Sequence, residues 1–422
     1  MASLCGTDQP GKPLGDGQLM RVLMTTSDHL MIDRRILQEA KTLTSAGNEV
    51  TLLAGFECGS PEAHEQDGIS IKRFSYDWSD RRFAALVKKF AWTPGSRIHR
   101  LSARIFNAWA ARIANINSFE QFVVDKILAE SFEIIHAHDY PMLAPAVEAA
   151  RIRGVPLVYD AHELYYAQVQ LPAPIRRAYR RREKRLIKSA DAVVTVNPYI
   201  SKLMSERYAI EPPQVLLNAA PLQPVERVID LRRQLGLPAA TKIVMYQGWI
   251  SSNRGIEILV ESARYLREEI VCVIVGYGDY ENSLKQIVEN KKLADKVFFW
   301  GGVPSADLHR ITCEADLGVI PYIGIDENNY FCSPNKLFEF AIAQIPFLSN
   351  DLPFLADVAR SYDNGVLQDI TTPEAMARAI NDIFSDEGRL ERLREGAKCA
   401  REFLNWELES RKLIDVYSGL KE

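Results

Sequence analysis

The segment MRVLMTTSDHLMIDRRILQEAKTLTSAGNEVTLLA, residues 20–54, gives the clearest indication of the fold class. A short apolar run at 21–24 predicts a strand, and apolar residues then recur at helical spacing from Ile36 to Ala46. Gly47 supplies a stop before a second apolar run at 50–54. A strand, a helix and another strand in succession predict parallel strands joined by a crossover helix.

The same alternation continues along both halves of the chain. Further strands are predicted at 134–136, 156–159, 192–196, 243–247, 271–276, 297–300, 317–320 and 346–349, with helices between them. A proline-rich stretch near 212–224 separates the halves. We therefore predict an α/β protein of two doubly wound parallel-sheet domains, both Rossmann-like, that face a central cleft.

The predicted domain boundaries fall where the alternation of strands and helices changes. They are a disordered leader at 1–18, a first domain at 19–222 with a helical insertion at 76–122, a second domain at 223–402, and a C-terminal helix at 403–422 that packs back toward the first domain. The leader is polar and rich in Gly and Pro, and it lacks the apolar segment of a secretory signal.

Composition narrows the class of protein. The chain has 422 residues, of which 47% are apolar, and no run approaches the ~20 apolar residues that a membrane span needs. None of the six cysteines forms a C-x-x-C pair, which favours free thiols in a reducing cytoplasm. A net charge of −4 argues against nucleic acid as a partner.

Charge is nevertheless uneven. Residues 1–222 hold 28 Lys and Arg against 24 Asp and Glu, whereas the remainder holds 23 against 31. Eight bases lie within 176–188, and eight more lie within 81–112 without an acid. These two segments favour contact with an anionic membrane surface or a lipid-linked acceptor, although a solvated basic face is an equal alternative.

The motif SPNKLFE, residues 333–339, follows the predicted strand at 317–320 and opens a helix. A helix N-terminus presents free N–H groups to an anion such as a diphosphate. Lys336 places a cation in the first turn, where the helix dipole disfavours one, so it needs an anionic partner. Glu339, one turn further, can accept hydrogen bonds from a ribose diol. The alternative is a solvated helix.

Two strand-to-helix turns in the second half are weaker indications. In QGWISSNRG, Gly248 lets the backbone approach a ligand, and Arg254 is placed to pair with phosphate oxygens. Gly276 stands in a G-x-G after the next strand. The full dinucleotide fingerprint is missing after the first strand, which argues against an NAD-dependent dehydrogenase.

Two polar motifs end strands of the first half. They are His136-Ala137-His138-Asp139 and Asp160-Ala161-His162-Glu163. Titratable groups at this edge of a parallel sheet are typical of function, although either histidine could simply be hydrogen-bonded in the core. A metal site from both histidines and carboxylates is disfavoured, and the chain contains no D-x-D motif. We expect no metal.

Together these motifs resemble the retaining glycosyltransferases of GT-B family 4 (group 1), in a subgroup that carries SPNKLFE. The pieces that match include HAHDYP, VYDAHELY, YQGWISSNRGIEILVESA and SPNKLFEFAIAQIPFL, and the match spans about residues 20–415. The resemblance implies catalytic roles for His138, Arg254 and Lys336. It implies donor binding by Gly248, Gly276, Gly302, Val303, Asn335, Leu337, Phe338 and Glu339, and it leaves Asp139, His162 and Glu163 as candidates on the acceptor side.

The chain departs from the family pattern at three places. Phe331 stands where the family commonly has a glutamate for the donor sugar, and Asn328, Asn329, Ser333 or Asn335 could replace it. Trp249 stands where a phosphate-binding arginine is common, and the glycine-rich loop after the first strand is absent.

The expected activity is transfer of a hexose-type sugar from a UDP- or GDP-linked donor, with retention of configuration and without metal or other cofactor. The acceptor is a glycan, a lipid-linked acceptor or a small molecule. Two other functions remain open, a nucleotide-sugar 2-epimerase and a non-catalytic nucleotide-sugar-binding protein. We expect a cytoplasmic protein, with peripheral association at the inner face of the membrane as an open alternative.

Overall fold

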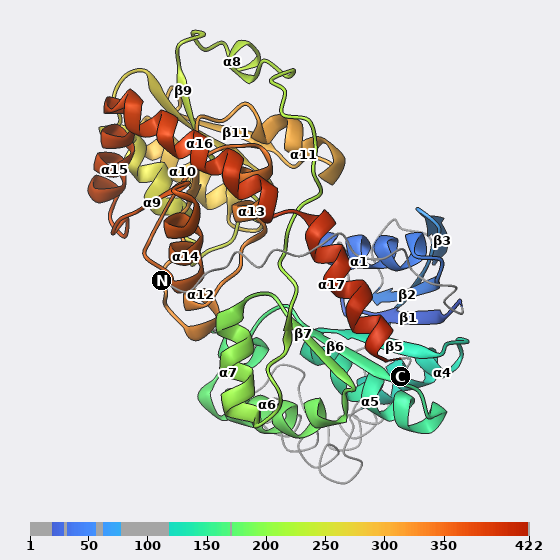
Figure 1. Ribbon diagram of the computed structural model, residues 1–422. Coiled ribbons are helices and arrows are strands. Elements are labelled where there is room, and N and C mark those ends of the chain that lie inside the picture. Colours follow the sequence, from blue (N-terminus) through green and yellow to red (C-terminus); the bar gives the residue numbers. More distant parts are fainter. Residues whose placement is uncertain (1–18, 29–31, 56–61, 77–117, 169–170, 421–422) are drawn as a thin grey trace.

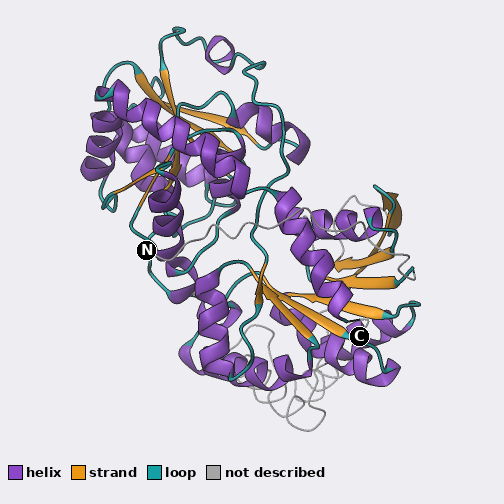
Figure 2. Cartoon of the chain, in the orientation of Figure 1, coloured by secondary structure: helices purple, strands orange, loops and turns teal. Residues whose placement is uncertain are grey.

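The computed structural model describes residues 19–28, 32–55, 62–76, 118–168 and 171–420. It contains two α/β bodies, each with a central sheet and helices on both faces (Figures 1 and 2). The leader predicted at 1–18 and most of the insertion predicted at 76–122 lie outside the described residues. Residues 118–122, the C-terminal end of that range, form the first part of a helix that continues to Leu128.

The first sheet has eight strands in the order β3-β4-β2-β1-β5-β6-β7-β8. Every neighbouring pair is parallel except β3 with β4, a departure from the all-parallel prediction. The strands are β1 (Arg21–Thr25), β2 (Glu49–Gly55), β3 (Ala63–Gln66), β4 (Ile69–Phe74), β5 (Ile134–His138), β6 (Leu157–Ala161), β7 (Ala192–Thr195) and β8 (Gln214–Val215). The longer helices are α1 (Arg34–Ser45), α4 (Ser118–Leu128), α5 (Asp139–Arg153), α6 (Ala173–Leu186) and α7 (Pro198–Tyr208).

Helix α1 shows how the sequence produces this arrangement. The Asp33 side chain caps the helix by accepting from the Arg35 backbone N–H at 2.8 Å. The apolar positions predicted from the sequence, such as Ile36 and Leu43, are fully buried against the sheet. Gly47, at φ +91°, turns the chain into β2. The strand order reverses between β1 and β5, so the loops after these strands open a crevice at the sheet edge.

The second sheet has six parallel strands in the order β11-β10-β9-β12-β13-β14, which is the strand order of a Rossmann domain. The strands are β9 (Lys242–Gln247), β10 (Ile270–Val275), β11 (Val297–Gly301), β12 (Leu317–Ile320), β13 (Phe347–Ser349) and β14 (Gly365–Leu367). The helices are α8 (Leu231–Gln234), α9 (Ile256–Ser262), α10 (Glu281–Asn290), α11 (Ser305–Thr312), α12 (Glu327–Tyr330), α13 (Asn335–Ile342), α14 (Pro353–Tyr362), α15 (Pro373–Ser385) and α16 (Glu387–Phe403). The order reverses between β9 and β12, and the loops after these two strands face the first domain.

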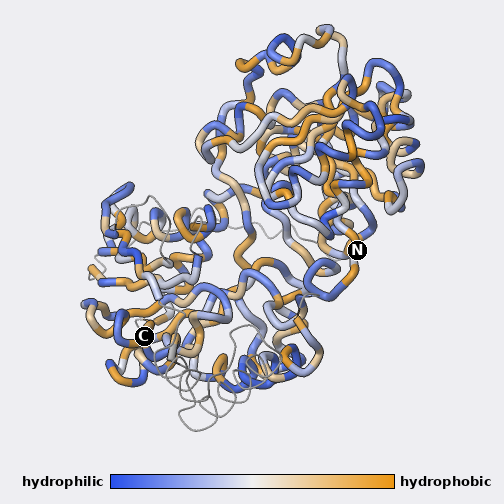
Figure 3. Tube along the Cα trace, turned by 180° about the vertical axis from the view of Figure 1, so that it is seen from behind, coloured by the Kyte–Doolittle hydropathy of each residue, from blue (hydrophilic) through white to orange (hydrophobic). Residues whose placement is uncertain are grey.

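Hydrophobic residues concentrate along the strands of both sheets, and hydrophilic residues lie toward the outside (Figure 3). Each sheet is buried on both faces, with separate apolar clusters above and below it. Because both faces are covered, only the strand ends are left to carry polar functional groups.

The chain crosses between the domains twice. It leaves the first domain after β8, and it returns after α16 as helix α17 (Trp406–Gly419), which lies against α1 (Figure 1). The two crossing segments are bonded to each other, since the Trp406 backbone N–H donates to the Ala220 carbonyl at 3.0 Å. The Trp406 indole donates to Thr42 Oγ1 at 2.9 Å, and Tyr417 Oη lies 2.9 Å from His136 Nδ1.

Candidate active site

A cavity of about 510 Å³ lies between the two domains, at the reversal points of both sheets. Loops and helix ends of the first domain supply one wall, and the loops after β9, β10 and β12 together with the start of α13 supply the other. Its lining includes Arg34, Asp139, His162, Glu163, Gly248, Arg254, Gly276, Val303, Asn335, Lys336 and Glu339. Most of the predicted site residues therefore meet here, although they are distant in sequence.

Two glycines shape the second-domain wall. Gly248 and Gly276 have φ values of +115° and +140°, which side-chain-bearing residues rarely adopt. A Cβ atom at Gly276 would lie only 2.0 Å from the Gly248 carbonyl oxygen, so the two loops nest only because Gly276 has no side chain. Gly302 does not line the cavity, unlike its neighbour Val303, and it packs against the ring of Tyr277.

Two cations, Arg254 and Lys336, lie close together in this wall. Arg254 donates to the Tyr322 hydroxyl, and Lys336 Nζ lies 3.2 Å from the same oxygen. The Lys336 ammonium also faces the rings of Tyr246 and Tyr322, at 4.8 and 4.7 Å from their centroids. Across the described ranges, neither cation forms an ion pair with a carboxylate. This wall therefore presents two cations that, among the described residues, are not directly paired with a carboxylate.

Glu339 lies on α13, three residues after Lys336, and also lines the cavity. Its carboxylate accepts from Arg34 of the first domain at 2.5 Å and from the Gln247 side-chain amide. Glu339 thus stands at the cavity edge that both domains share, and its two oxygens are held in fixed positions.

The start of α13 differs in part from the prediction. Asn335 lines the cavity, but the side chains of Leu337 and Phe338 are fully buried in the core and do not line it. The Leu337 backbone N–H already donates to the Pro334 carbonyl at 3.0 Å. These two side chains therefore belong to the core, where their apolar groups complete the packing of the helix against the sheet.

The polar residues around the missing family glutamate do line the cavity. Asn328, Asn329, Ser333 and Asn335 are all part of its surface. Phe331 instead stacks against Tyr199 of the first domain, with ring centroids 6.1 Å apart.

Asp139, His162 and Glu163 are part of the first-domain wall. Asp139 has a left-handed backbone, φ +62°, and its side chain accepts from the His162 backbone N–H at 3.0 Å. Burial raises the pKa of Asp139 to about 7. Burial lowers the pKa of His162, but the carboxylates of Asp139 and Asp160 raise it more strongly, to about 10. Glu163 accepts from the Asn328 amide at 2.8 Å, which joins the two walls.

His138 is placed differently from the prediction. It was expected beside the transferred sugar, but its side chain is fully buried and does not line the cavity. Its Nδ1 lies 3.2 Å from His162 Nε2, so it stands directly behind the histidine that does line the wall. Burial lowers the pKa of His138 to about 4, which keeps the ring neutral. β5 is covered on both faces, and this burial takes the side chain of its last residue out of the cavity.

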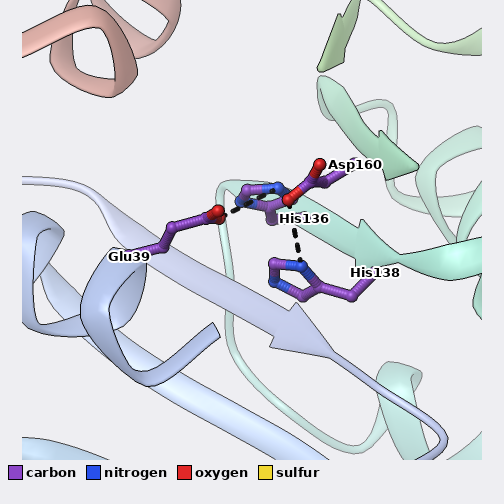
Figure 4. A group of neighbouring side chains, drawn as sticks. All are labelled: Glu39, His136, His138 and Asp160. Carbon is purple, nitrogen blue, oxygen red and sulfur yellow. Dashed lines mark ion pairs between the residues drawn. The ribbon is translucent and has the colours of Figure 1, made fainter. Parts of the chain in front are cut away.

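Behind this wall lie four buried side chains, Glu39, His136, His138 and Asp160 (Figure 4). Their ligand-type atoms lie within 4.8 Å of one another, close enough to hold a metal ion. Arg35, however, donates to Glu39 at 2.7 Å and to Asp160 at 2.9 Å. A divalent ion would add positive charge beside this buried guanidinium, so we interpret the cluster as an ion-pair network that supports the wall.

Sequence reasoning gave no role to Arg34, Arg35 or Glu39, and it named Tyr322 only as the residue that opens the motif ending at Glu339. Arg35 and Glu39 are four residues apart and adjoin the apolar face of α1, a pattern that indicates a buried ion pair. Tyr322 closely follows β12, at the carboxyl end where ligands of such sheets bind.

Family models cover most of the chain. The model of glycosyl transferases group 1 matches residues 228–399, and the model of the glycosyl transferase 4-like domain matches residues 32–219. The chain therefore belongs to the group 1 glycosyltransferases, and its two α/β domains form a GT-B fold.

Individual relatives agree with this assignment. A D-inositol 3-phosphate glycosyltransferase of Xylanimonas cellulosilytica is 24% identical over 314 residues, covering 68% of this chain and 72% of the relative. Sucrose-phosphate synthase from Thermosynechococcus elongatus has the same fold, with a TM-score of 0.67 at 18% identity over 95% of this chain and 99% of the other. Anabaena HepE, solved with UDP-glucose, gives a TM-score of 0.70 at 16% identity over 95% of this chain and all of the other.

Proposed function

We propose that this glycosyltransferase moves a hexose from a UDP- or GDP-linked donor onto its acceptor with retention of anomeric configuration. The observation that carries the proposal is the pair Arg254 and Lys336, two cations on the cavity wall that form no ion pair with a carboxylate of the described residues. A sugar diphosphate supplies the countercharge that such a pair lacks. The binding of UDP-glucose by a structural neighbour supports a nucleotide-sugar donor.

In the proposed reaction, the bond between the anomeric carbon and the diphosphate oxygen breaks, and the acceptor oxygen bonds to the same face of that carbon. The departing diphosphate takes the proton of the acceptor hydroxyl. Arg254 and Lys336 stabilise the negative charge that develops on the leaving group, which is commonly the largest catalytic contribution. Glu339 holds the ribose hydroxyls in this arrangement, and His162, supported by His138, lies on the sugar side.

We propose that no metal ion takes part, because two fixed cations already serve the diphosphate. Neither the epimerase nor the non-catalytic alternative is favoured by the family match.

The donor is tested by thermal shift with UDP-, GDP- and ADP-sugars, followed by NMR of the anomeric proton in the product. We expect one nucleotide-sugar class to raise the melting temperature and the product to keep the donor configuration. An inverted product would contradict retention, and binding without transfer to any of a panel of sugar and lipid acceptors would favour a binding protein.

For the acceptor, we propose a lipid-linked or glycan molecule presented at an anionic membrane. Helix α6 carries bases that are exposed, including Arg177, Arg181 and Lys184, and Lys188 follows it. Each Lys or Arg near an anionic surface contributes about 1 kcal/mol, and the attraction fades over a Debye length of ~8 Å at physiological salt. The segment 81–112 lies outside the described residues. No helix among the described residues is long and apolar enough to span a bilayer.

Flotation with anionic vesicles tests this proposal. We expect the protein to float at low salt, and to stop floating at high salt or when Arg177, Arg181, Lys184 and Lys188 are all changed to Gln. A wild-type protein that stays in the soluble fraction at low salt would favour a soluble acceptor.

A further inference from the structure

Tyr322 lies between the two cations of the cavity wall. Its hydroxyl oxygen accepts from Arg254 and lies 3.2 Å from Lys336 Nζ. Its ring faces both cations as well, at 5.2 Å from the Arg254 guanidinium carbon and 4.7 Å from Lys336 Nζ. The two positive groups are therefore held near one oxygen atom, although like charges repel.

The backbone fixes this arrangement from both sides. Gly255, which follows Arg254, packs so closely on Pro321 that a Cβ atom there would lie 2.1 Å from the Pro321 carbonyl oxygen. The Tyr322 carbonyl accepts from the Asn350 side chain at 2.8 Å, and only 6% of the residue is exposed. Because the turn that carries Arg254 rests on the segment that carries Tyr322, the phenol and the guanidinium keep their relative positions.

The hydroxyl hydrogen of Tyr322 is still available to donate a hydrogen bond. A phenolic oxygen can accept hydrogen bonds and donate one, and here the accepting side is taken by Arg254 and Lys336. In the part of the chain that the structure describes, Tyr322 donates to no acceptor, and the residue lines the cavity. Two cations beside this position favour an anionic hydrogen-bond acceptor over a neutral one.

We propose that Tyr322 is a third diphosphate-binding residue, which donates its hydroxyl to the diphosphate while it keeps Arg254 and Lys336 together. The inference rests on the function proposed above and adds a residue to it. A neutral donor of this kind strengthens the hold on the leaving group without adding a further repulsive charge. It also takes over part of the role that the family gives to an arginine where this chain has Trp249.

The test removes one oxygen atom with Tyr322→Phe and measures the affinities for UDP and GDP by calorimetry. We expect the affinity for the preferred nucleoside diphosphate to fall roughly tenfold, as for loss of a hydrogen bond to a charged group, while the melting temperature stays near wild type. Tyr159→Phe is the matched control, because it also removes a buried hydroxyl that is hydrogen-bonded to a titratable side chain, Glu183, and neither residue lines the cavity. Diphosphate affinity of Tyr322→Phe within about twofold of wild type would overturn the inference.

A second measurement uses a tyrosine analogue that retains the hydroxyl group. With 3-fluorotyrosine at position 322, the 19F resonance should shift when UDP or GDP saturates the protein, and an unmoved resonance would overturn the inference even if Tyr322→Phe folded poorly. Failure of the proposed function looks different, because the wild-type protein would then bind neither nucleoside diphosphate.

Discussion

Each domain has a buried cation at or behind its cavity wall, and the two cations differ in the partners that surround them. In the first domain, Arg35 is paired with two carboxylates, Glu39 and Asp160, and the side chains of all three are at most 3% exposed. In the second domain, Lys336 is as well buried, yet its partners are a phenol oxygen and two aromatic rings. A buried cation with matched carboxylates supports the fold, whereas one with only neutral partners is available to an anionic ligand.

The largest effect should follow from breaking the paired cation. Arg35→Met leaves Glu39 and Asp160 without their common partner, so we expect the free energy of unfolding to fall by about 3–5 kcal/mol. Chemical denaturation measures it. Arg151→Met is the control, because Arg151 forms an exposed pair with Glu148 and should leave the free energy of unfolding nearly unchanged. A small loss for Arg35→Met would show that the network does not support the first-domain wall.

Removal of Arg254 should instead lower turnover and leave stability almost unchanged. Arg254→Ala removes charge that stabilises the leaving diphosphate, and we expect kcat to fall by about 10²- to 10³-fold with little change in melting temperature. Steady-state kinetics with the donor found in the screen provides the measurement. Turnover near wild type would leave this role to Lys336 alone.

A smaller effect is expected at the edge that both domains share. Glu339→Gln keeps the shape of the side chain but weakens hydrogen bonds to the ribose, so donor affinity should fall by about 1.5–3 kcal/mol with the fold intact. Glu327→Gln is the control, since Glu327 also pairs with an arginine of the first domain, Arg207, at 2.5 Å. Donor affinity that is equal in wild type and Glu339→Gln would remove Glu339 from the ribose role.

The smallest effect concerns metal. If the two cations alone serve the diphosphate, treatment with a chelator should leave the transfer rate nearly unchanged. Activity that disappears with EDTA and returns with Mg²⁺ or Mn²⁺ would mean that Arg254 and Lys336 are insufficient. A bound metal ion would then also be needed to neutralise the diphosphate.

Much of the fold could be predicted because hydrophobic periodicity is a local property. The helix at 34–45 and the strand at 317–320 follow directly from the spacing of apolar residues and the turns beside them. The antiparallel strand at 63–66 could not be predicted in this way, because it is short and largely exposed and lacks an alternation of apolar residues.

The candidate site was predictable only at the level of motifs. Turn glycines and helix starts identified Gly248, Arg254 and Glu339, because those features depend on nearby sequence. The pairing of Arg35 with Asp160 depends on a residue 125 positions away in the sequence. The burial of His138 depends on the elements that cover both faces of its sheet. The apolar character of Leu337 and Phe338 predicts that their side chains are buried. We assigned them to the donor site because they belong to the SPNKLFE motif.

The double crossing of the chain has a mechanical consequence for the cavity. A single linker would let the second domain swivel about any axis, but two segments hydrogen-bonded side by side at Ala220 and Trp406 resist twisting and leave one direction of bending easy. Opening and closing of the two walls should therefore follow one hinge coordinate. Distances between pairs of spin labels placed across the cavity should then change in fixed proportion, and independent changes would rule out a single hinge.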